Sequence, residues 1–228
     1  MIITIDGPAG SGKSSVARSL AKKLGFFHLG TGLLYRTLAY VLIMKRGTIV
    51  CQRFLRDSSL IISQDLDVLS DVKYTYDDQG IHIFYKDLEI THRITDVKIE
   101  NFVSHLSSFQ FVRDRLLDFQ RSFAKNNDVV ADGRDCGTIV FPHADVKFFL
   151  TADFQTRLNR ICADTQRKSA YLEREQIAKE LQERDHRDLT REIAPLKIAD
   201  GAIVIDNSNL SQEETLECFL AEIEKIRK

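Results

Sequence analysis

Residues 7–15 read GPAGSGKSS and follow the apolar run 2–5, with only Asp6 between them. Gly7, Gly12, Lys13 and Ser14 fit the pattern G-x-x-x-x-G-K-[ST] of a loop that binds nucleotide phosphates. The next stretch, SSVARSLAKKLG, has apolar residues at 16, 20 and 24 and a glycine at 25, which is typical of a helix that ends there. A strand before the loop and a helix after it are the context that this motif requires, so the stretch predicts a nucleoside triphosphate site.

The chemistry of such a loop follows from its backbone. Successive N–H groups, together with the positive end of the next helix, can surround a β-phosphate. Lys13 would reach the β- and γ-oxygens, and the Ser14 hydroxyl would bind Mg²⁺. The residues that we expect around the nucleotide are Gly7, Gly10, Ser11, Gly12, Lys13, Ser14 and Ser15.

The loop does not say how ATP or GTP is used, because kinases, GTPase switches and motor ATPases share it. The chain has no Asn-Lys pair, so the guanine-reading motif N-K-x-D is absent. A D-x-x-G match at 77–80 lies in a predicted turn. Both observations disfavour a GTPase switch.

Other short apolar runs predict four further strands, separated by helical patterns, at 26–29, 128–131, 146–150 and 202–205. Strands that alternate with helices favour an α/β fold, with a five-stranded parallel sheet covered on both faces. Residues 66–95 differ, since they are rich in Val, Ile, Tyr and Thr around the turn DDQG. We predict a small antiparallel meander there, inserted on the core.

Charge and cysteine content restrict the partners. Lys and Arg total 32 against 33 acidic residues, so the chain has no excess of positive charge that would indicate nonspecific binding to nucleic acid. The four cysteines form no C-x-x-C pair and are expected to be reduced thiols. The N-terminus does not look like a signal peptide, and no apolar run approaches the roughly 20 residues of a spanning helix. We expect a cytoplasmic monomer without membrane or nucleic-acid partners.

The stretch 182–196, QERDHRDLTREIAPL, raises the question of what its arginines hold. From about residue 171 onward the pattern predicts one helix, with Ile177 and Leu181 facing the core. The same stripe continues into Arg184, Asp188 and Arg191. Its charges therefore lie on the side that faces the core rather than on the opposite side.

The charge order on this helix is also unusual for a solvated surface. Arg187 and Arg191 are a like-charge i,i+4 pair, and the base Arg184 precedes its acid Asp188. Geometry and charge favour an anion site here over an ion-paired surface helix, which is the alternative. Asp185 and His186 fall off the stripe, and the expected surroundings of both are solvent.

Two further stretches lie near predicted strand ends. In VVADGRDCGTIVF, Asp132, Arg134 and Asp135 follow a strand at the edge where open α/β sheets bind ligands. The alternative is a loop with a local Arg–Asp pair. In HLGTGLLYR, Thr31 and Arg36 lie near a strand end and the helix after it, a weak signal when taken alone.

In this order and spacing, the motifs GPAGSGKSS, GTGLLYR, ADGRDCGTIVFP and ERDHRDLTREIAPL closely resemble those of the bacterial cytidylate kinases, which belong to the nucleoside monophosphate kinase group. The resemblance covers nearly the whole chain, and the meander is similar to an insertion of the bacterial enzymes. It implies transfer of the γ-phosphoryl group of ATP to CMP or dCMP, with Mg²⁺, in pyrimidine nucleotide metabolism. It implies one P-loop kinase domain over 1–228. Its expected parts are a core at about 1–33, 126–156 and 170–228, an acceptor-binding region at about 34–125, and a lid at about 157–169.

The resemblance also implies site residues. Those expected at the acceptor phosphate are Thr31, Arg36, Arg134 and Arg191. Those expected at the ribose are Arg184 and Asp188, and those at the base are Ser104, Arg113 and Asp135. Lid contacts to ATP are expected from Arg160 and Arg167. The groups expected to act in catalysis are Lys13, Asp132, Arg134, Arg187 and Arg191.

Residue chemistry supports one of these roles independently. A carboxylate at Asp135 can accept from the N4 amino group of cytosine, whereas uracil presents an oxygen there. Ser104 and Arg113 rest on the resemblance, since by residue type alone both would be surface residues.

The chain departs from the family pattern at two places. It has Gly30-Thr31-Gly32 where the family often has Asp-Ser-Gly, and Cys136 where the family often has Met. Two other functions stay open at this point: a P-loop kinase of another nucleotide or metabolite, and a nucleotide-binding regulator without phosphoryl transfer.

Overall fold

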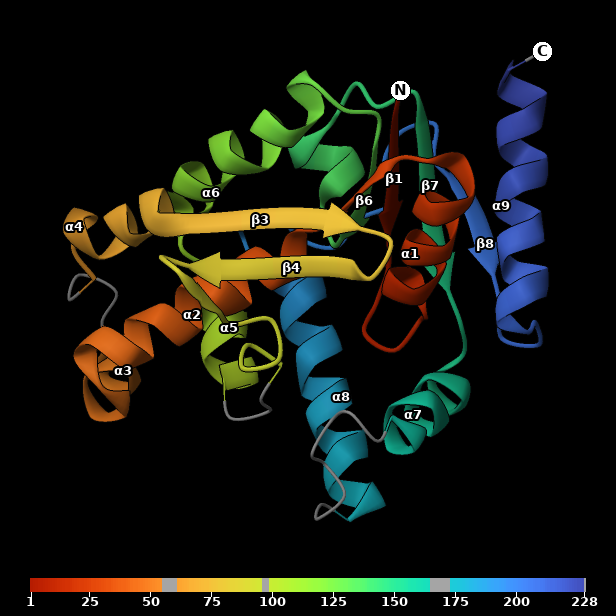
Figure 1. Cartoon of the computed structure of the whole chain (residues 1–228). Helices are drawn as coiled ribbons and strands as arrows, with labels where there is room; N and C mark the ends of the chain where they lie inside the picture. Colours follow the sequence, from red (N-terminus) through yellow and green to blue (C-terminus); the bar gives the residue numbers. More distant parts are fainter. Residues whose placement is uncertain (55–60, 96–98, 165–172, 228) are drawn as a thin grey trace. The chain divides into compact units, whose positions relative to one another are not determined.

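The computed structural model describes residues 1–54, 61–95, 99–164 and 173–227 (Figure 1). The chain divides into two compact units, Met1–Thr31 with Gln120–Lys228 and Gly32–Phe119. The first unit contains the P-loop. The second covers most of residues 34–125, for which the acceptor-binding role stays a prediction.

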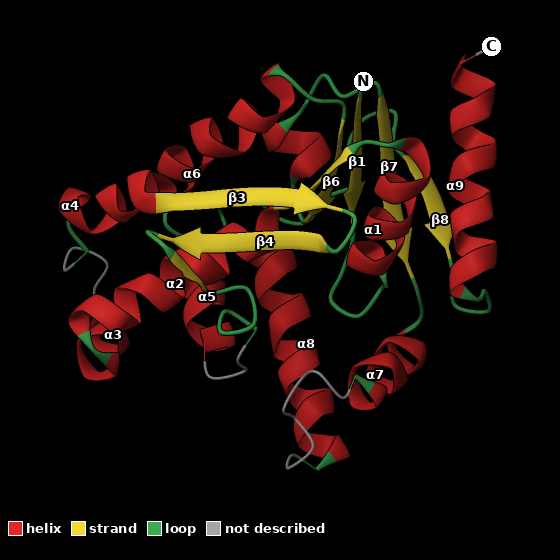
Figure 2. Ribbon diagram, viewed as in Figure 1, coloured by secondary structure: helices red, strands yellow, loops and turns green. Residues whose placement is uncertain are grey.

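The first unit is built on a five-stranded parallel sheet with the strand order β2-β6-β1-β7-β8. Strands β6, β1, β7 and β8 can be followed side by side in Figure 2. Its strands are β1 Ile2–Asp6, β2 Phe27–Gly30, β6 Val129–Gly133, β7 Val146–Thr151 and β8 Ile203–Asp206. Ile3, Ile5 and Val130 are fully buried, as expected in parallel strands that are covered on both faces. The prediction of five parallel strands from the apolar runs is confirmed.

The same unit contains several helices. They are α1 Lys13–Leu24, the short helices η4 Phe123–Lys125 and η5 Cys136–Val140, α7 Phe154–Ala163, α8 Arg174–Thr190 and α9 Gln212–Arg227. Helix α1 contacts β1, β2 and β6 and also packs against α9. Its buried stripe includes Val16 and Leu20, four residues apart, and it ends at Gly25 as predicted. Phe148 of β7 and Phe219 of α9 join sheet and helix, with ring centroids 4.3 Å apart.

The second unit combines a three-stranded antiparallel sheet with helices. The strands are β3 Val72–Asp77, β4 Gly80–Tyr85 and β5 Leu88–Glu89, in this order. The helices are α2 Thr31–Arg46, α3 Thr48–Phe54, α4 Ser63–Leu66, η2 Asp67–Asp71, α5 Glu100–Leu106 and α6 Gln110–Ser122. The predicted turn DDQG does join two antiparallel strands, β3 and β4.

The prediction that the antiparallel meander begins at residue 66 is wrong. Residues 66–71 form helical turns rather than a strand. Leu66, Val68 and Leu69 are buried there. A short apolar run of this kind cannot be assigned to strand or helix from its periodicity alone.

Three strands of the first unit end together at one edge of the sheet. In the parallel register, Asp6 pairs with Gly133 and Gly30 pairs with Asp132. Loops that leave the carboxyl ends of parallel strands form the ligand sites of open α/β folds. The P-loop and the loop that starts at Arg134 both leave from this edge.

Candidate active site

The P-loop, residues 7–15, joins β1 to α1. Gly12, immediately before α1, has a φ of 89°, a left-handed conformation that residues with a side chain rarely adopt. Lys13 is buried, and its Nζ donates to the Pro8 carbonyl oxygen at 2.9 Å. Burial, and after it the charge of Arg134, lower the pKa of Lys13 well below its usual range. An anion bound beside this ammonium group would stabilise its charge.

Arg157 of α7 donates hydrogen bonds to the P-loop and to neighbouring segments. Its guanidinium donates to the Ala9 carbonyl oxygen at 3.0 Å and to the Ala152 carbonyl oxygen at 3.1 Å. It also pairs with the Asp185 carboxylate of α8 at 2.6 Å. Asp185 was expected in solvent, and that prediction is wrong, because the carboxylate is needed to neutralise a buried arginine.

Arg160, one turn further along α7, also contacts the loop. It donates to the Ser11 carbonyl oxygen at 3.3 Å and to the Asn207 side-chain oxygen at 3.0 Å. Asn207 is buried and donates to the same Ser11 carbonyl at 3.1 Å. Contact of Arg160 with ATP stays a prediction, and Arg167 lies outside the described residues.

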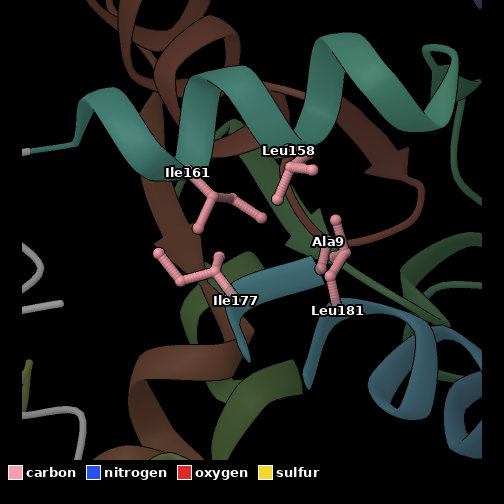
Figure 3. Packing of buried hydrophobic residues seen from close by; sticks show 5 residues of the cluster. All are labelled: Ala9, Leu158, Ile161, Ile177 and Leu181. Atoms are coloured by element: carbon pink, nitrogen blue, oxygen red, sulfur yellow. The ribbon is translucent and has the colours of Figure 1, made fainter. Parts of the chain in front are cut away.

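Apolar packing accompanies these hydrogen bonds. Figure 3 shows Leu158 and Ile161 of α7 and Ile177 and Leu181 of α8 gathered around Ala9 of the P-loop. The prediction that Ile177 and Leu181 face the core is therefore confirmed. The loop conformation depends on both helices, although they are more than 140 residues away in sequence.

Asp132, at the end of β6, is buried beside the start of α1. Its Oδ2 accepts from the Ser14 hydroxyl at 2.6 Å, and its Oδ1 lies 2.8 Å from His28 Nε2. Burial disfavours the carboxylate most, but His28, Ser14 and the charge of Lys13 together outweigh burial and lower the pKa of Asp132. Asp132 is therefore an ionised acceptor that is held from two sides.

A cluster of positive charge surrounds Asp188 of α8. Arg134 Nε donates to Asp188 Oδ2 at 2.8 Å, and Arg191 lies 4.0 Å from the other carboxylate oxygen. Burial is the largest influence on Asp188, but the charges of Arg134, Arg184 and Arg191 overcome it and lower its pKa. Lys13 also interacts electrostatically with Arg134, Arg184 and Asp188. The structure thus brings together four of the predicted site cations, which we call the cation cluster: Lys13, Arg134, Arg184 and Arg191.

The prediction that one helix continues as far as Arg191 is wrong. Helix α8 ends at Thr190, so Arg191 does not continue its stripe but occupies an extended position with ψ of 138°. Arg191 reaches Asp188 from beyond the helix, and its Nε donates to the Ala194 carbonyl oxygen at 2.7 Å. Arg187 pairs instead with Glu183 at 3.9 Å and leaves 37% of its side chain exposed.

Asp6, at the end of β1, organises the loop that contains Asp135. Its carboxylate accepts from the backbone N–H groups of Cys136 at 2.8 Å and Gly137 at 2.7 Å. Burial raises the pKa of Asp6 to about 6, and the charge of the nearby Asp135 acts in the same direction. Asp135 itself is buried, directly before η5. Its predicted role at the base stays a prediction.

Thr31 is buried against the same loop. Its hydroxyl donates to the Asp132 carbonyl oxygen at 2.8 Å. A Cβ at Gly133 would lie 2.3 Å from the Thr31 hydroxyl oxygen, so only glycine fits there without a shift of Thr31. Because phosphate oxygens only accept hydrogen bonds, Thr31 would have to redirect its hydrogen to meet one. Contact with the acceptor phosphate stays a prediction.

Three predicted substrate residues belong to the second unit. Arg36 donates to the Ile94 carbonyl oxygen at 3.3 Å, and Ser104 is half-buried on α5. Arg113 is buried, lies 5.8 Å over the Tyr35 ring and donates to the Ser107 carbonyl oxygen at 3.0 Å. Residue type alone predicted a surface position for Arg113, which is wrong. The substrate roles of all three stay predictions.

Reasoning from the sequence missed four polar residues that shape this site: Asp6, His28, Arg157 and Asn207. His28 lies within an apolar strand and Asp6 at the end of one, and an ionisable side chain in or next to an apolar run is a signal that could have identified them. Asn207 and Arg157 form their contacts through distant segments, for which the sequence gives no local signal.

In the described part of the chain, no three or more His, Cys, Asp or Glu side chains group closely enough to hold a metal ion. Nor does any described helix have the length and apolar character needed to cross a membrane. All four cysteines are free thiols.

Comparison with known proteins identifies relatives over the full length. A family model described as cytidylate kinase matches residues 3–225. A cytidylate kinase of Fusobacterium nucleatum is 35% identical over 227 residues, covering 100% of this chain and 99% of the relative. A cytidylate kinase of Thermotoga neapolitana is 39% identical over 227 residues, covering 99% and 98%.

Solved structures also share the fold. One of them, an uncharacterized protein from Eubacterium ventriosum, superposes with a TM-score of 0.50 at 14% identity, covering 98% of each chain. At this identity the match supports the shared fold alone.

Proposed function

The chain belongs to the cytidylate kinase family, and we propose that it transfers the γ-phosphoryl group of ATP to CMP or dCMP, giving ADP and CDP or dCDP. The enzyme class is that of the nucleoside monophosphate kinases. The residue roles that follow are part of the proposal.

The cation cluster is the single observation that carries the mechanism best. Lys13 at the start of α1 and three arginines from two other segments act electrostatically on one another and share the Asp188 carboxylate. Two polyphosphate substrates repel each other, so gathering them in line requires positive groups placed in advance. A cluster with more cations than local anions supplies such groups.

The acceptor explains why no general base needs to be assigned. A nucleoside monophosphate has a second phosphate pKa of about 6, so its attacking oxygen is already largely deprotonated at neutral pH. In the proposal, Arg134 and Arg191 bind this phosphate and stabilise the transferring group, while Lys13 binds the donor. Arg184 and Asp188 would then bind the ribose, with the Asp188 carboxylate accepting from sugar hydroxyls.

We propose that Ser14 binds Mg²⁺ together with the nucleotide phosphates. The Ser14 hydroxyl hydrogen is donated to Asp132, which leaves the oxygen lone pairs for a cation. Bound Mg²⁺ would neutralise charge that develops on the phosphate oxygens. It takes most of its ligands from water and phosphates, so one or two protein oxygens suffice.

Base selection is proposed for Asp135, with Ser104 and Arg113 as further contacts. A carboxylate accepts from the cytosine N4 amino group and is unfavourable beside the uracil O4. We propose further that the enzyme works in the cytoplasm as a monomer, in keeping with its balanced charge and free thiols.

One assay separates the candidate functions. ADP release from Mg·ATP is measured with CMP, dCMP, UMP, AMP or no acceptor. We expect fastest turnover with CMP or dCMP and little without acceptor. Equal rates with all acceptors would contradict base recognition, and turnover only with another nucleotide would indicate a different kinase. Binding of ATP without turnover of any acceptor would contradict the kinase proposal and favour a regulator.

A further inference from the structure

A histidine lies behind the P-loop where no nucleotide motif requires one. His28 is in the middle of β2 and only 2% exposed, and its Nε2 lies 2.8 Å from Asp132 Oδ1. The other oxygen of the same carboxylate accepts from Ser14 at 2.6 Å. One buried carboxylate therefore joins a strand histidine to the P-loop serine.

The strand register explains how His28 reaches Asp132. Strand β2 pairs in parallel with β6, with His28 opposite Val130 and Gly30 opposite Asp132. Residues 28 and 30 share one face of β2, because side chains alternate along a strand. Position 30, the direct neighbour of Asp132, is a glycine, so the nearest β2 side chain on that face is the imidazole of His28. The departure of Gly30 from the family pattern and the presence of His28 thus belong to one arrangement.

The hydrogen-bond roles follow from the charge of Asp132. An ionised carboxylate can only accept, so His28 Nε2 must donate the hydrogen in this contact. Each Asp132 oxygen then has a donor of its own, His28 for Oδ1 and Ser14 for Oδ2. This arrangement fixes the rotation of the carboxylate and directs the Ser14 hydrogen away from the phosphate side.

If His28 were lost, the Asp132 carboxylate would interact with Lys13 instead. Lys13 interacts electrostatically with Asp132. It directly precedes Ser14 in the P-loop. A carboxylate oxygen without a donor in a buried site is unfavourable, so Asp132 would turn toward the Lys13 ammonium. That movement would remove the partner of the Ser14 hydroxyl and draw Lys13 away from the donor phosphates.

We propose that His28 is a positioning residue for phosphoryl transfer, which holds Asp132 so that Ser14 and Lys13 are free for Mg²⁺ and phosphate. The proposal rests on the function proposed above. His28 itself touches no substrate and acts through Asp132. Groups around a metal ligand commonly change metal affinity or activity by about 10- to 100-fold when they are removed.

The test uses two substitutions at one site. His28→Phe keeps a ring in the buried space but removes the donor, and His28→Gln keeps an N–H near the place of Nε2. Calorimetry measures ADP affinity for the full-length protein with Mg²⁺ and with EDTA, which needs no catalysis. Steady-state assays with CMP then give kcat and KM.

For His28→Phe we expect the gain in ADP affinity on adding Mg²⁺ to shrink by about tenfold, with smaller change in EDTA. We expect kcat to fall by a similar factor while KM for CMP changes less than about threefold, and His28→Gln should restore most of both losses. Leu29→Val is the matched control: it removes a buried methylene from the same strand but leaves both hydrogen bonds of Asp132. It should lower thermal stability without changing the effect of Mg²⁺.

The outcomes are distinct. An unchanged Mg²⁺ effect on ADP affinity in His28→Phe would overturn the proposal, and so would equal losses in His28→Phe and Leu29→Val, because packing alone would then explain them. If the unsubstituted protein binds Mg·ADP but does not phosphorylate CMP, the proposed function fails. The calorimetric comparison still decides whether His28 positions the metal-binding serine.

Discussion

Two groups of arginines near the P-loop behave differently. Arg157 and Arg160 of α7 donate to the backbone carbonyls of Ala9 and Ser11 and have further fixed partners in Asp185 and Asn207. Arg134, Arg184 and Arg191 instead converge on one carboxylate, Asp188, close to the buried Lys13. The first group completes its interactions inside the protein. The second has an excess of positive charge, which an anionic ligand would balance.

The difference shows that residue type and spacing are a weak guide to the role of an arginine. Arg157 and Arg160 lie in the basic stretch that was expected to form a lid over ATP. In the structure both donate to backbone carbonyls of the P-loop, and contact of Arg160 with ATP stays a prediction. For Arg184 and Arg191 the spacing favoured an anion site, with an ion-paired surface helix as the alternative, and the structure shows that both act on the same carboxylate, Asp188. The charge balance among the neighbours separates a supporting arginine from a binding one.

The largest expected effect is on stability, at Arg157. Arg157→Met removes the buried guanidinium that pairs with the half-buried Asp185 carboxylate, which we expect to lower the free energy of unfolding by about 3–5 kcal/mol. Urea unfolding measures the change. The double variant Arg157→Met, Asp185→Leu should recover part of the loss, because it removes the uncompensated charge. Full stability in the single variant would contradict the supporting role.

At Arg134, which belongs to the second group of arginines, substitution should reduce activity more than stability. Arg134→Met should lower kcat/KM for CMP by about 100- to 1000-fold, because it removes a cation from the transferring phosphate. The change in unfolding free energy should be smaller than for Arg157→Met, since Arg184 and Arg191 still balance Asp188. Arg115→Met, which breaks only an exposed pair with Asp67, serves as the control. A loss of stability without a loss of activity would reverse the assignment of the two groups.

Two buried carboxylates extend the comparison to pH. Neutral N–H groups hold Asp6, and burial raises its pKa to about 6, whereas arginines lower the pKa of Asp188. For Asp6, the stabilising contribution is complete below the unfolded pKa of 3.8 and is lost as the pH rises through about 6. For Asp188, stability is present above 3.8 and is lost as the pH falls through its lowered pKa.

The shift at Asp6 corresponds to about 3 kcal/mol between low and high pH. Carbon-13 titration of the side-chain carboxyl groups should give a midpoint near 6 for Asp6 and one below 3.8 for Asp188. Spectra of Asp6→Asn and Asp188→Asn assign the two signals. A midpoint of Asp6 at or below 3.8 would show that its N–H donors dominate over burial.

The smallest expected effect concerns selectivity beside the cation cluster. Asp135→Asn replaces an acceptor by an amide that can also donate, so the preference for CMP over UMP should narrow by about tenfold. The measurement is the ratio of kcat/KM values for the two substrates. Because the cations are unchanged, catalysis with CMP should fall less than in Arg134→Met. An unchanged ratio would remove Asp135 from base recognition.

Much of the first unit could be predicted from its sequence. The runs at 2–5 and 146–150 became β1 and β7, because a parallel strand buried on both faces is apolar throughout. The helix that starts at Lys13 ended at Gly25 as its spacing indicated. These features depend on local patterns of apolar residues and on the backbone freedom of glycine.

The details of the site were less predictable. Helical spacing correctly placed Asp188 on a buried face but could not show that α8 stops before Arg191. It also placed Asp185 in solvent, since the partner Arg157 is 28 residues away in sequence and on another helix. Contacts of this kind depend on how helices pack, which spacing within one helix does not encode.

The strand–loop–helix of the P-loop, the order of the motifs and the family can all be identified from neighbouring residues. Which charges lie together depends on how the chain folds in three dimensions. The tertiary structure places Arg134 of one loop against Asp188 of a distant helix, and His28 of β2 beside Asp132 of β6. The effect of a charge depends on its distance from other charges and on its burial. Residues 54 or 104 positions apart become neighbours only when the sheet and its helices assemble.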